Sequence, residues 1–198
     1  HPAGARLRAG NGARLHGKGR PARLGRQIAS ARGASQSGAA IEPDSQMRPE
    51  LRLATPGDIG ILVSLVGAYH EFEGIDLVPE ARAGAIMPLL ERDDLGRIWL
   101  VLWDDVVVGY IALGFGYSIE FGGRDAFVDE FFLEESVRGR GIGRAVLRDV
   151  AAEAREFSIR ALHLEVAKGN ARAIRLYTAA GFEPRAKYRL MTLQLKPA

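Results

Sequence analysis

A glycine-rich turn between a strand-like segment and an amphipathic helix restricts the possible folds of this chain more than any other part of its sequence. Residues 126–133 have the pattern of a strand, residues 138–144 contain three glycines, and residues 142–157 repeat apolar side chains at helical spacing. Glycines let the backbone turn sharply and approach a ligand closely, and the first amides of a helix point outward without acceptors. The segment therefore predicts an anion site, suited to a pyrophosphate, within an α/β fold.

The rest of the chain after residue 46 alternates between strand and helix patterns. Turn signals such as Gly74, the pair Asp104-Asp105 and Gly181 separate these segments. The expected strands are residues 51–54, 97–103, 106–115, 126–133, 161–167 and 188–195, and the expected helices are 56–73, 79–92, 142–157 and 170–180. Strands joined as hairpins come first and a β-α-β-α-β series follows, so we expect a central mixed β-sheet flanked by helices on both faces.

The glycine turn differs from the two best-known nucleotide loops. It lacks the Gly-Lys-Ser/Thr ending of a nucleotide-hydrolase loop. It also lacks the GxGxxG phasing of a dinucleotide fold and lies late in the chain, whereas that motif follows the first strand. These differences argue against both classes.

Residues 1–46 form a basic leader, rich in Ala, Gly, Arg and Ser, that we expect to be disordered or non-native sequence. It holds eight of the 27 basic residues and only two of the 24 acidic ones, so the remainder carries a formal charge of −3. A transit peptide and an RNA-binding arm are the competing interpretations of the leader. The acidic remainder argues against a nucleic-acid partner for the folded domain, expected at residues 47–198.

The chain contains no cysteine, which excludes disulfides, thiolate metal sites and a thiol nucleophile. The cytoplasm is the compartment that this composition fits, and no metal is expected. No apolar run reaches eighteen residues, so no membrane span is expected.

Two motifs carry a resemblance to a known family. Arg138, Gly141 and Gly143 fit the pattern Arg/Gln-x-x-Gly-x-Gly; about thirty residues later come Asn170, then Tyr177 seven residues on, and then Gly-Phe. This arrangement resembles the GNAT superfamily of N-acetyltransferases, over the whole chain except the leader. The resemblance implies a GNAT-like acyl-CoA N-acyltransferase fold, with acetyl-CoA (coenzyme A) as the cofactor.

The resemblance also implies which residues bind the cofactor. Strand residues before the turn would pair with the pantetheine arm where two parallel strands diverge, and the turn amides would hold the pyrophosphate. Asn170 would hydrogen-bond the cofactor arm, and Tyr177 would lie near the sulfur. The implied set is Phe132, Leu133, Arg138, Gly139, Arg140, Gly141, Ile142, Gly143, Arg144, Asn170 and Tyr177.

Three residues are candidates for proton transfer. The resemblance gives Tyr177 the role of acid for the departing thiolate, and a tyrosine with a pKa near 10 is protonated at neutral pH; the alternative is a core aromatic residue. The base is Glu130, Glu165 or a chain of waters. Glu130 is expected on one strand face with Val128 and Phe132, where apolar neighbours would raise its pKa. Either glutamate could instead be an ion-paired scaffold residue.

The resemblance implies that the acceptor lies over the cofactor, between the loop after the first helix and the segment before the fourth strand. Acidic and aromatic side chains gather there: Tyr69, Glu71, Phe72, Glu73 and Tyr117. They suit a small cationic amine, which without an acyl-cysteine intermediate would attack the thioester directly in a ternary complex. Three alternatives remain: a protein N-terminal or lysine acetyltransferase, a coenzyme A-binding sensor without turnover, and an RNA-associated protein acting through the leader. Dimers are common in the family, so a homodimer is a further expectation.

Overall fold

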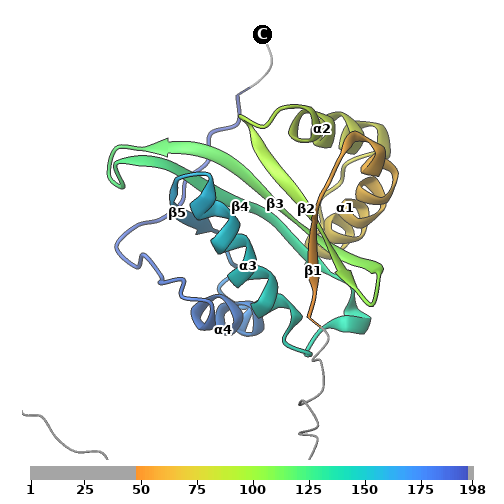
Figure 1. The fold of residues 1–198 in the computed structure, drawn as a ribbon. Coiled ribbons are helices and arrows are strands. Elements are labelled where there is room, and N and C mark those ends of the chain that lie inside the picture. Colours follow the sequence, from red (N-terminus) through yellow and green to blue (C-terminus); the bar gives the residue numbers. More distant parts are fainter. Residues whose placement is uncertain (1–47, 196–198) are drawn as a thin grey trace, which may run out of the picture. The chain divides into compact units, whose positions relative to one another are not determined.

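The computed structural model describes residues 48–195. This part of the chain forms an α/β domain, while the predictions made for the leader lie outside the described residues. In chain order, the elements are β1 (Glu50–Leu53), α1 (Ile59–Glu73), α2 (Pro79–Glu91), β2 (Gly96–Trp103), β3 (Val106–Ser118), β4 (Gly123–Leu133), α3 (Ile142–Glu156), β5 (Ile159–Leu164) and α4 (Ala171–Ala179) (Figure 1).

The five strands form a single mixed sheet in the order β1-β2-β3-β4-β5. Neighbours from β1 to β4 pair antiparallel, and β4 pairs with β5 in parallel. The parallel ladder ends where Val128 faces Leu164, although β4 continues to Leu133. The two parallel strands therefore diverge just before the glycine turn, as the family resemblance implies.

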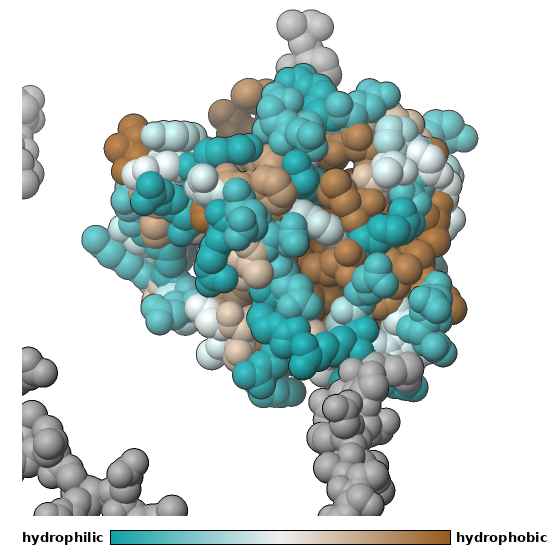
Figure 2. Space-filling view, viewed as in Figure 1, coloured by the Kyte–Doolittle hydropathy of each residue, from teal (hydrophilic) through white to brown (hydrophobic). Residues whose placement is uncertain are grey.

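Helices cover both faces of the sheet, which confirms the predicted α/β architecture. One core lies under α1 and α2 and contains Leu62, Ile86 and Tyr110. The other lies under α3 and contains Val146 and Val150. Figure 2, viewed from the α3 side, shows hydrophilic surface over this helix, as expected for an amphipathic element that buries one face (Figure 2).

Local sequence signals set several of the boundaries. Gly74 has a left-handed φ of 72° and ends α1, which is the conformation that glycine adopts most readily. Asp104 and Asp105, with φ values of 54° and 59°, form the tight hairpin between β2 and β3. Before α1, the Asp58 carboxylate accepts hydrogen bonds from the Thr55 backbone N–H (2.8 Å) and hydroxyl (2.9 Å). This contact closes a 3-10 turn that leads into the helix.

A β-bulge interrupts β4 at Asp129. Ala112 of β3 faces Glu130, but the next residue, Leu113, faces Val128, so Asp129 has no opposite residue. An extra residue in one strand reverses the alternation of side chains beyond it. The prediction that Glu130 shares a face with Val128 is therefore wrong: Val128 packs under α3, whereas Glu130 and Phe132 face α1.

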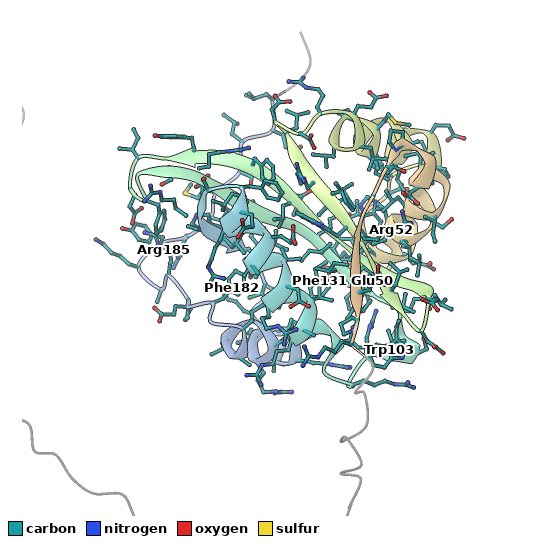
Figure 3. All side chains as sticks on the ribbon, viewed as in Figure 1. Glu50, Arg52, Trp103, Phe131, Phe182 and Arg185 are labelled. Atoms are coloured by element: carbon teal, nitrogen blue, oxygen red, sulfur yellow. The ribbon has the colours of Figure 1, made fainter. Side chains whose placement is uncertain are left out.

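Two strand predictions near the C-terminus are also wrong. β5 ends at Leu164 and not at residue 167, and residues 188–195 lie in no helix or strand. In the second case Arg185, which Figure 3 labels, forms an ion pair with Glu120 in the turn between β3 and β4 (2.7 Å). The segment after α4 thus crosses the open end of the sheet.

Candidate active site

A cleft of about 1380 Å³ opens where β4 and β5 diverge. Its walls are the end of α1, the last residues of β4, the glycine turn, α4 with the turn before it, and residues 186–190. Pockets for drug-sized ligands occupy about 300–1,000 Å³. The cleft is therefore large enough for an extended cofactor together with a second substrate.

The glycine turn presents backbone amides to this cleft. Gly139 and Gly141 have left-handed φ values of 85° and 82°, and α3 begins directly afterwards. The first backbone hydrogen bond at this helix end runs from the Arg144 N–H to the Gly141 carbonyl (3.1 Å). The N–H groups of residues 142 and 143 come before it and have no acceptor within the helix. A Cβ on Gly141 would meet no atom within 4 Å. The turn is thus an open nest of N–H groups.

The side chain of Arg138 points back to the scaffold. Its Nε donates to the Leu133 carbonyl (2.7 Å), and its guanidinium lies 5.4 Å from the centre of the Phe132 ring and 5.7 Å from that of Phe72. Arg138 therefore ties the glycine turn to β4 and α1.

Other cationic side chains line the cleft beside the turn. Arg144 comes from α3, Lys168 from the segment after β5, and Arg172 from α4. The Arg172 guanidinium lies 3.7 Å from the position that a Cβ on Gly139 would occupy. An amide nest flanked by three cations fits the diphosphate of coenzyme A. Sequence reasoning missed Lys168 and Arg172, although both flank Asn170 in the second motif.

Most, but not all, of the remaining predicted cofactor residues line the cleft. Asn170 lines the cleft and caps α4, with its Oδ1 accepting from the Ala173 N–H (3.0 Å). Phe132, Leu133, Gly143 and Tyr177 also line the cleft. Arg140 and Ile142 do not: Arg140 is exposed, and Ile142 is buried in the core under α3.

Tyrosine and carboxylate side chains meet at the α1 end of the cleft. Tyr177 of α4 packs edge-on against Phe182 (5.8 Å between ring centres). Burial, followed by the charge of Glu73, raises the pKa of Tyr177, so its hydroxyl stays protonated at neutral pH. Burial and the nearby carboxylates, Glu73 first, raise the pKa of Tyr69 to about 12. Both tyrosines are proton donors under ordinary conditions.

The predicted base Glu130 lies behind the wall of the cleft. Its Oε1 contacts Nε2 of His70 at 2.8 Å, and its Oε2 accepts a hydrogen bond from the Tyr110 hydroxyl at 2.5 Å. His70 and Tyr110 are both buried. With both oxygens engaged, Glu130 has no free oxygen directed at a substrate.

The bulge brings Asp129, which sequence reasoning missed, into the cleft instead. Desolvation by the surrounding protein, followed by the charge of Glu130, raises the pKa of the Asp129 carboxyl. The sequence signal for this bulge is a change in which alternate residues are apolar: Ala126 and Val128 face the core under α3 before the bulge, and Phe131 and Leu133 face it afterwards. Phe132 hides this signal, because with it the apolar residues at even positions also continue without a break.

The other predicted site residues fall into two groups. Glu165 is exposed just after β5 and lines the cleft, as do Phe72 and Glu73. Glu71 and Tyr117 do not line it, and Tyr117 is 73% exposed on β3. Tyr69, Phe72 and Glu73, expected in the loop after the first helix, lie in the last turns of α1, and Tyr117, expected in the segment before the fourth strand, lies in β3.

Comparison with known proteins identifies the family. The sequence profile of the acetyltransferase (GNAT) family matches residues 65–182, which is more than half of the chain. The chain therefore belongs to the GNAT acetyltransferase family, whose acetyl donor is acetyl-CoA. The predicted family and fold class are confirmed.

Individual relatives show how far the similarity extends. Thialysine N-ε-acetyltransferase from Bos taurus is 36% identical over 75 residues, which cover 38% of this chain and 44% of the bovine enzyme. The match thus spans less than half of that relative. An integron cassette protein from the mobile metagenome of Cole Harbour Salt Marsh is 36% identical, with a TM-score of 0.66, over 75% of this chain and 91% of that one.

A third relative shares the fold alone. The structure of a predicted acetyltransferase with acetyl-CoA from Clostridium acetobutylicum is 21% identical, with a TM-score of 0.60, over 73% of this chain and 96% of that one.

Among residues 48–195, no helix is long and apolar enough to cross a membrane.

Proposed function

We propose that this chain transfers the acetyl group of acetyl-CoA to the primary amine of a small cationic acceptor, by direct attack within a ternary complex. The observation that carries the proposal is one continuous cleft with an amide nest and cations at one end and acidic and tyrosine side chains at the other. The first end suits a diphosphate and the second suits an amine. Family membership supports the same reaction class.

The cofactor would be held by groups that the fold already directs into the cleft. The amides of Gly139, Gly141 and Gly143 and the cations Arg144, Lys168 and Arg172 would bind the diphosphate. Asn170 and the free edge of β4 would bind the pantetheine arm. When bound, acetyl-CoA supplies a thioester whose acetyl carbon forms a bond to the acceptor nitrogen while the carbon–sulfur bond breaks.

Proton transfers are assigned to Asp129 and Tyr177. An acceptor amine enters as an ammonium and must lose a proton before it can attack. Asp129 suits this step because its carboxylate reaches the cleft and its raised pKa makes it a better proton acceptor than an ordinary aspartate. Tyr177 suits protonation of the departing thiolate because its hydroxyl keeps its proton at neutral pH.

The acceptor end favours a cation. Glu73 and Asp129 supply negative charge there, and Tyr69 and Phe72 supply aromatic faces. The name of the bovine relative, a thialysine acetyltransferase, is consistent with an acceptor that resembles an amino acid or a short amine.

An amine panel tests the proposal. Thiol release from acetyl-CoA should be measured with polyamines, lysine-like amino acids including thialysine, aminoglycosides, and a peptide with a free N-terminus. We expect at least one small cationic amine to be acetylated faster than the peptide. Faster acetylation of the peptide would favour a protein acetyltransferase. Coenzyme A binding without thiol release from any amine would indicate a sensor.

A further inference from the structure

Behind the acceptor end of the cleft, two buried polar side chains and one partly buried carboxylate, from three different elements, form a network. His70 comes from α1, Tyr110 from β3 and Glu130 from β4. Side chains with these polar groups are rarely buried unless they are hydrogen-bonded to one another. None of the three lines the cleft, so none contacts a substrate bound there.

The hydrogen-bond pattern determines how the network is held. The Tyr110 hydroxyl donates to one Glu130 oxygen at 2.5 Å, and His70 Nε2 contacts the other at 2.8 Å. A carboxylate can only accept hydrogen bonds, so the second contact requires the proton on Nε2. Both oxygens of Glu130 are thus engaged, and His70 links the bulged strand to α1.

The network lies directly next to the bulge. Glu130 follows Asp129 in the chain, and it faces α1 because the extra residue at Asp129 shifts the strand. The same α1 turns carry Tyr69 and Glu73 into the cleft. The contact between Glu130 and His70 therefore fixes the position of Asp129 relative to Tyr69 and Glu73 of α1.

We propose that His70, Glu130 and Tyr110 are positioning residues that fix the orientation and the electrostatic surroundings of the Asp129 carboxylate. This inference rests on the proposed role of Asp129 as the base. The charged and titratable groups around Asp129 are Glu130 from β4, Tyr69 and His70 from α1, and Tyr110 from β3. Glu130 raises the pKa of Asp129, and a protonated His70 lowers it to a smaller extent.

Nuclear magnetic resonance can test the electrostatic part without an activity assay. The side-chain carboxyl carbon of Asp129, assigned by comparison with Asp129→Asn, is titrated with pH in the wild type and in Glu130→Gln. Glutamine keeps the size of the side chain and removes the negative charge. We expect the Asp129 midpoint to move to lower pH in the variant. An unchanged midpoint, or one that moves to higher pH, would overturn the proposal.

Kinetics test the positioning part. His70→Asn shortens the side chain and loses the contact at Nε2, so kcat should fall on the order of 10-fold with little change in the KM for acetyl-CoA. His70→Gln places an amide nitrogen near the Nε2 position and should recover most of the lost rate. His163→Asn is the matched control, because His163 pairs with Asp125 (3.4 Å) away from the cleft, and it should leave kcat unchanged.

The possible outcomes separate this inference from the proposed function. Unchanged kcat in His70→Asn, or no recovery with His70→Gln, would overturn the positioning role while acetylation by the wild type would still support the function. If no amine is acetylated, the proposed function fails, and the carboxyl titration still decides whether Glu130 controls Asp129.

Discussion

Replacing Gly141 with glutamate is expected to abolish coenzyme A binding while the fold is retained. Gly141 is exposed, and a Cβ there would point into open space beside the amide nest. A carboxylate at this position would occupy the nest and repel the diphosphate. Like charges about 4 Å apart at an effective dielectric of about 20 repel by roughly 4 kcal/mol, so a loss of at least about 100-fold in affinity is expected in calorimetry.

Two control variants separate charge from backbone strain. Gly141→Gln carries the same strain at a φ of 82° without the charge, so it should bind coenzyme A more tightly than the glutamate variant. Gly84→Glu adds a carboxylate to α2, outside the cleft, and should bind like the wild type. Undiminished affinity in Gly141→Glu, with unfolding temperatures close to that of the wild type, would contradict the proposed cofactor loop.

Asp129→Asn is expected to lower kcat by about 10²- to 10⁴-fold, the range typical for loss of a general base. Asparagine matches the shape of aspartate but cannot take the ammonium proton. The KM for acetyl-CoA should change little, because the diphosphate site lies at the other end of the cleft. In the wild type, activity should fall as the pH drops through the raised pKa of Asp129, and the variant should lack this dependence.

Two further variants sharpen this test. Asp125→Asn alters the same strand four residues earlier, where the carboxylate pairs with His163 outside the cleft, and should keep the wild-type rate. Glu165→Gln removes a carboxylate that lines the cleft and that the sequence suggested as a base. A large loss of rate in Glu165→Gln together with a normal rate in Asp129→Asn would transfer the role to Glu165.

The cofactor side of the site was predictable because its signals are local. Three glycines in seven residues, followed by an amphipathic pattern, determine a turn and a helix start with little help from the rest of the chain. The structure begins α3 at Ile142, the first residue of the helix that the sequence predicts. Asn170 likewise caps α4 through a contact within its own first turn.

The base could not be assigned from the sequence because its position depends on pairing between strands. A strict two-residue alternation places Glu130 with Val128, and only the register against β3 shows that Asp129 is the extra residue. The hydrogen bonds that engage Glu130 come from His70 and Tyr110, 60 and 20 residues away in the chain. No local pattern encodes such contacts.

The prediction of a last strand at residues 188–195 was wrong for a related reason. Tyr188, Leu190, Leu193 and Leu195 suggested a strand, but an apolar pattern specifies a strand only where a sheet edge accepts it. Here these side chains are at least 56% exposed, and the tie between Arg185 and Glu120 directs the segment across the cleft. Residues 186–190 consequently form part of the cleft wall.

The amides of the glycine turn are the groups that we propose bind the diphosphate of coenzyme A. The most direct measurement is a titration of the ¹⁵N-labelled full chain with coenzyme A, followed by amide chemical shifts. We expect the largest changes at Gly139, Gly141 and Gly143, with Gly60 and Gly84 on the α1 and α2 side unaffected. Saturable binding that leaves the three turn amides unshifted would contradict this proposal.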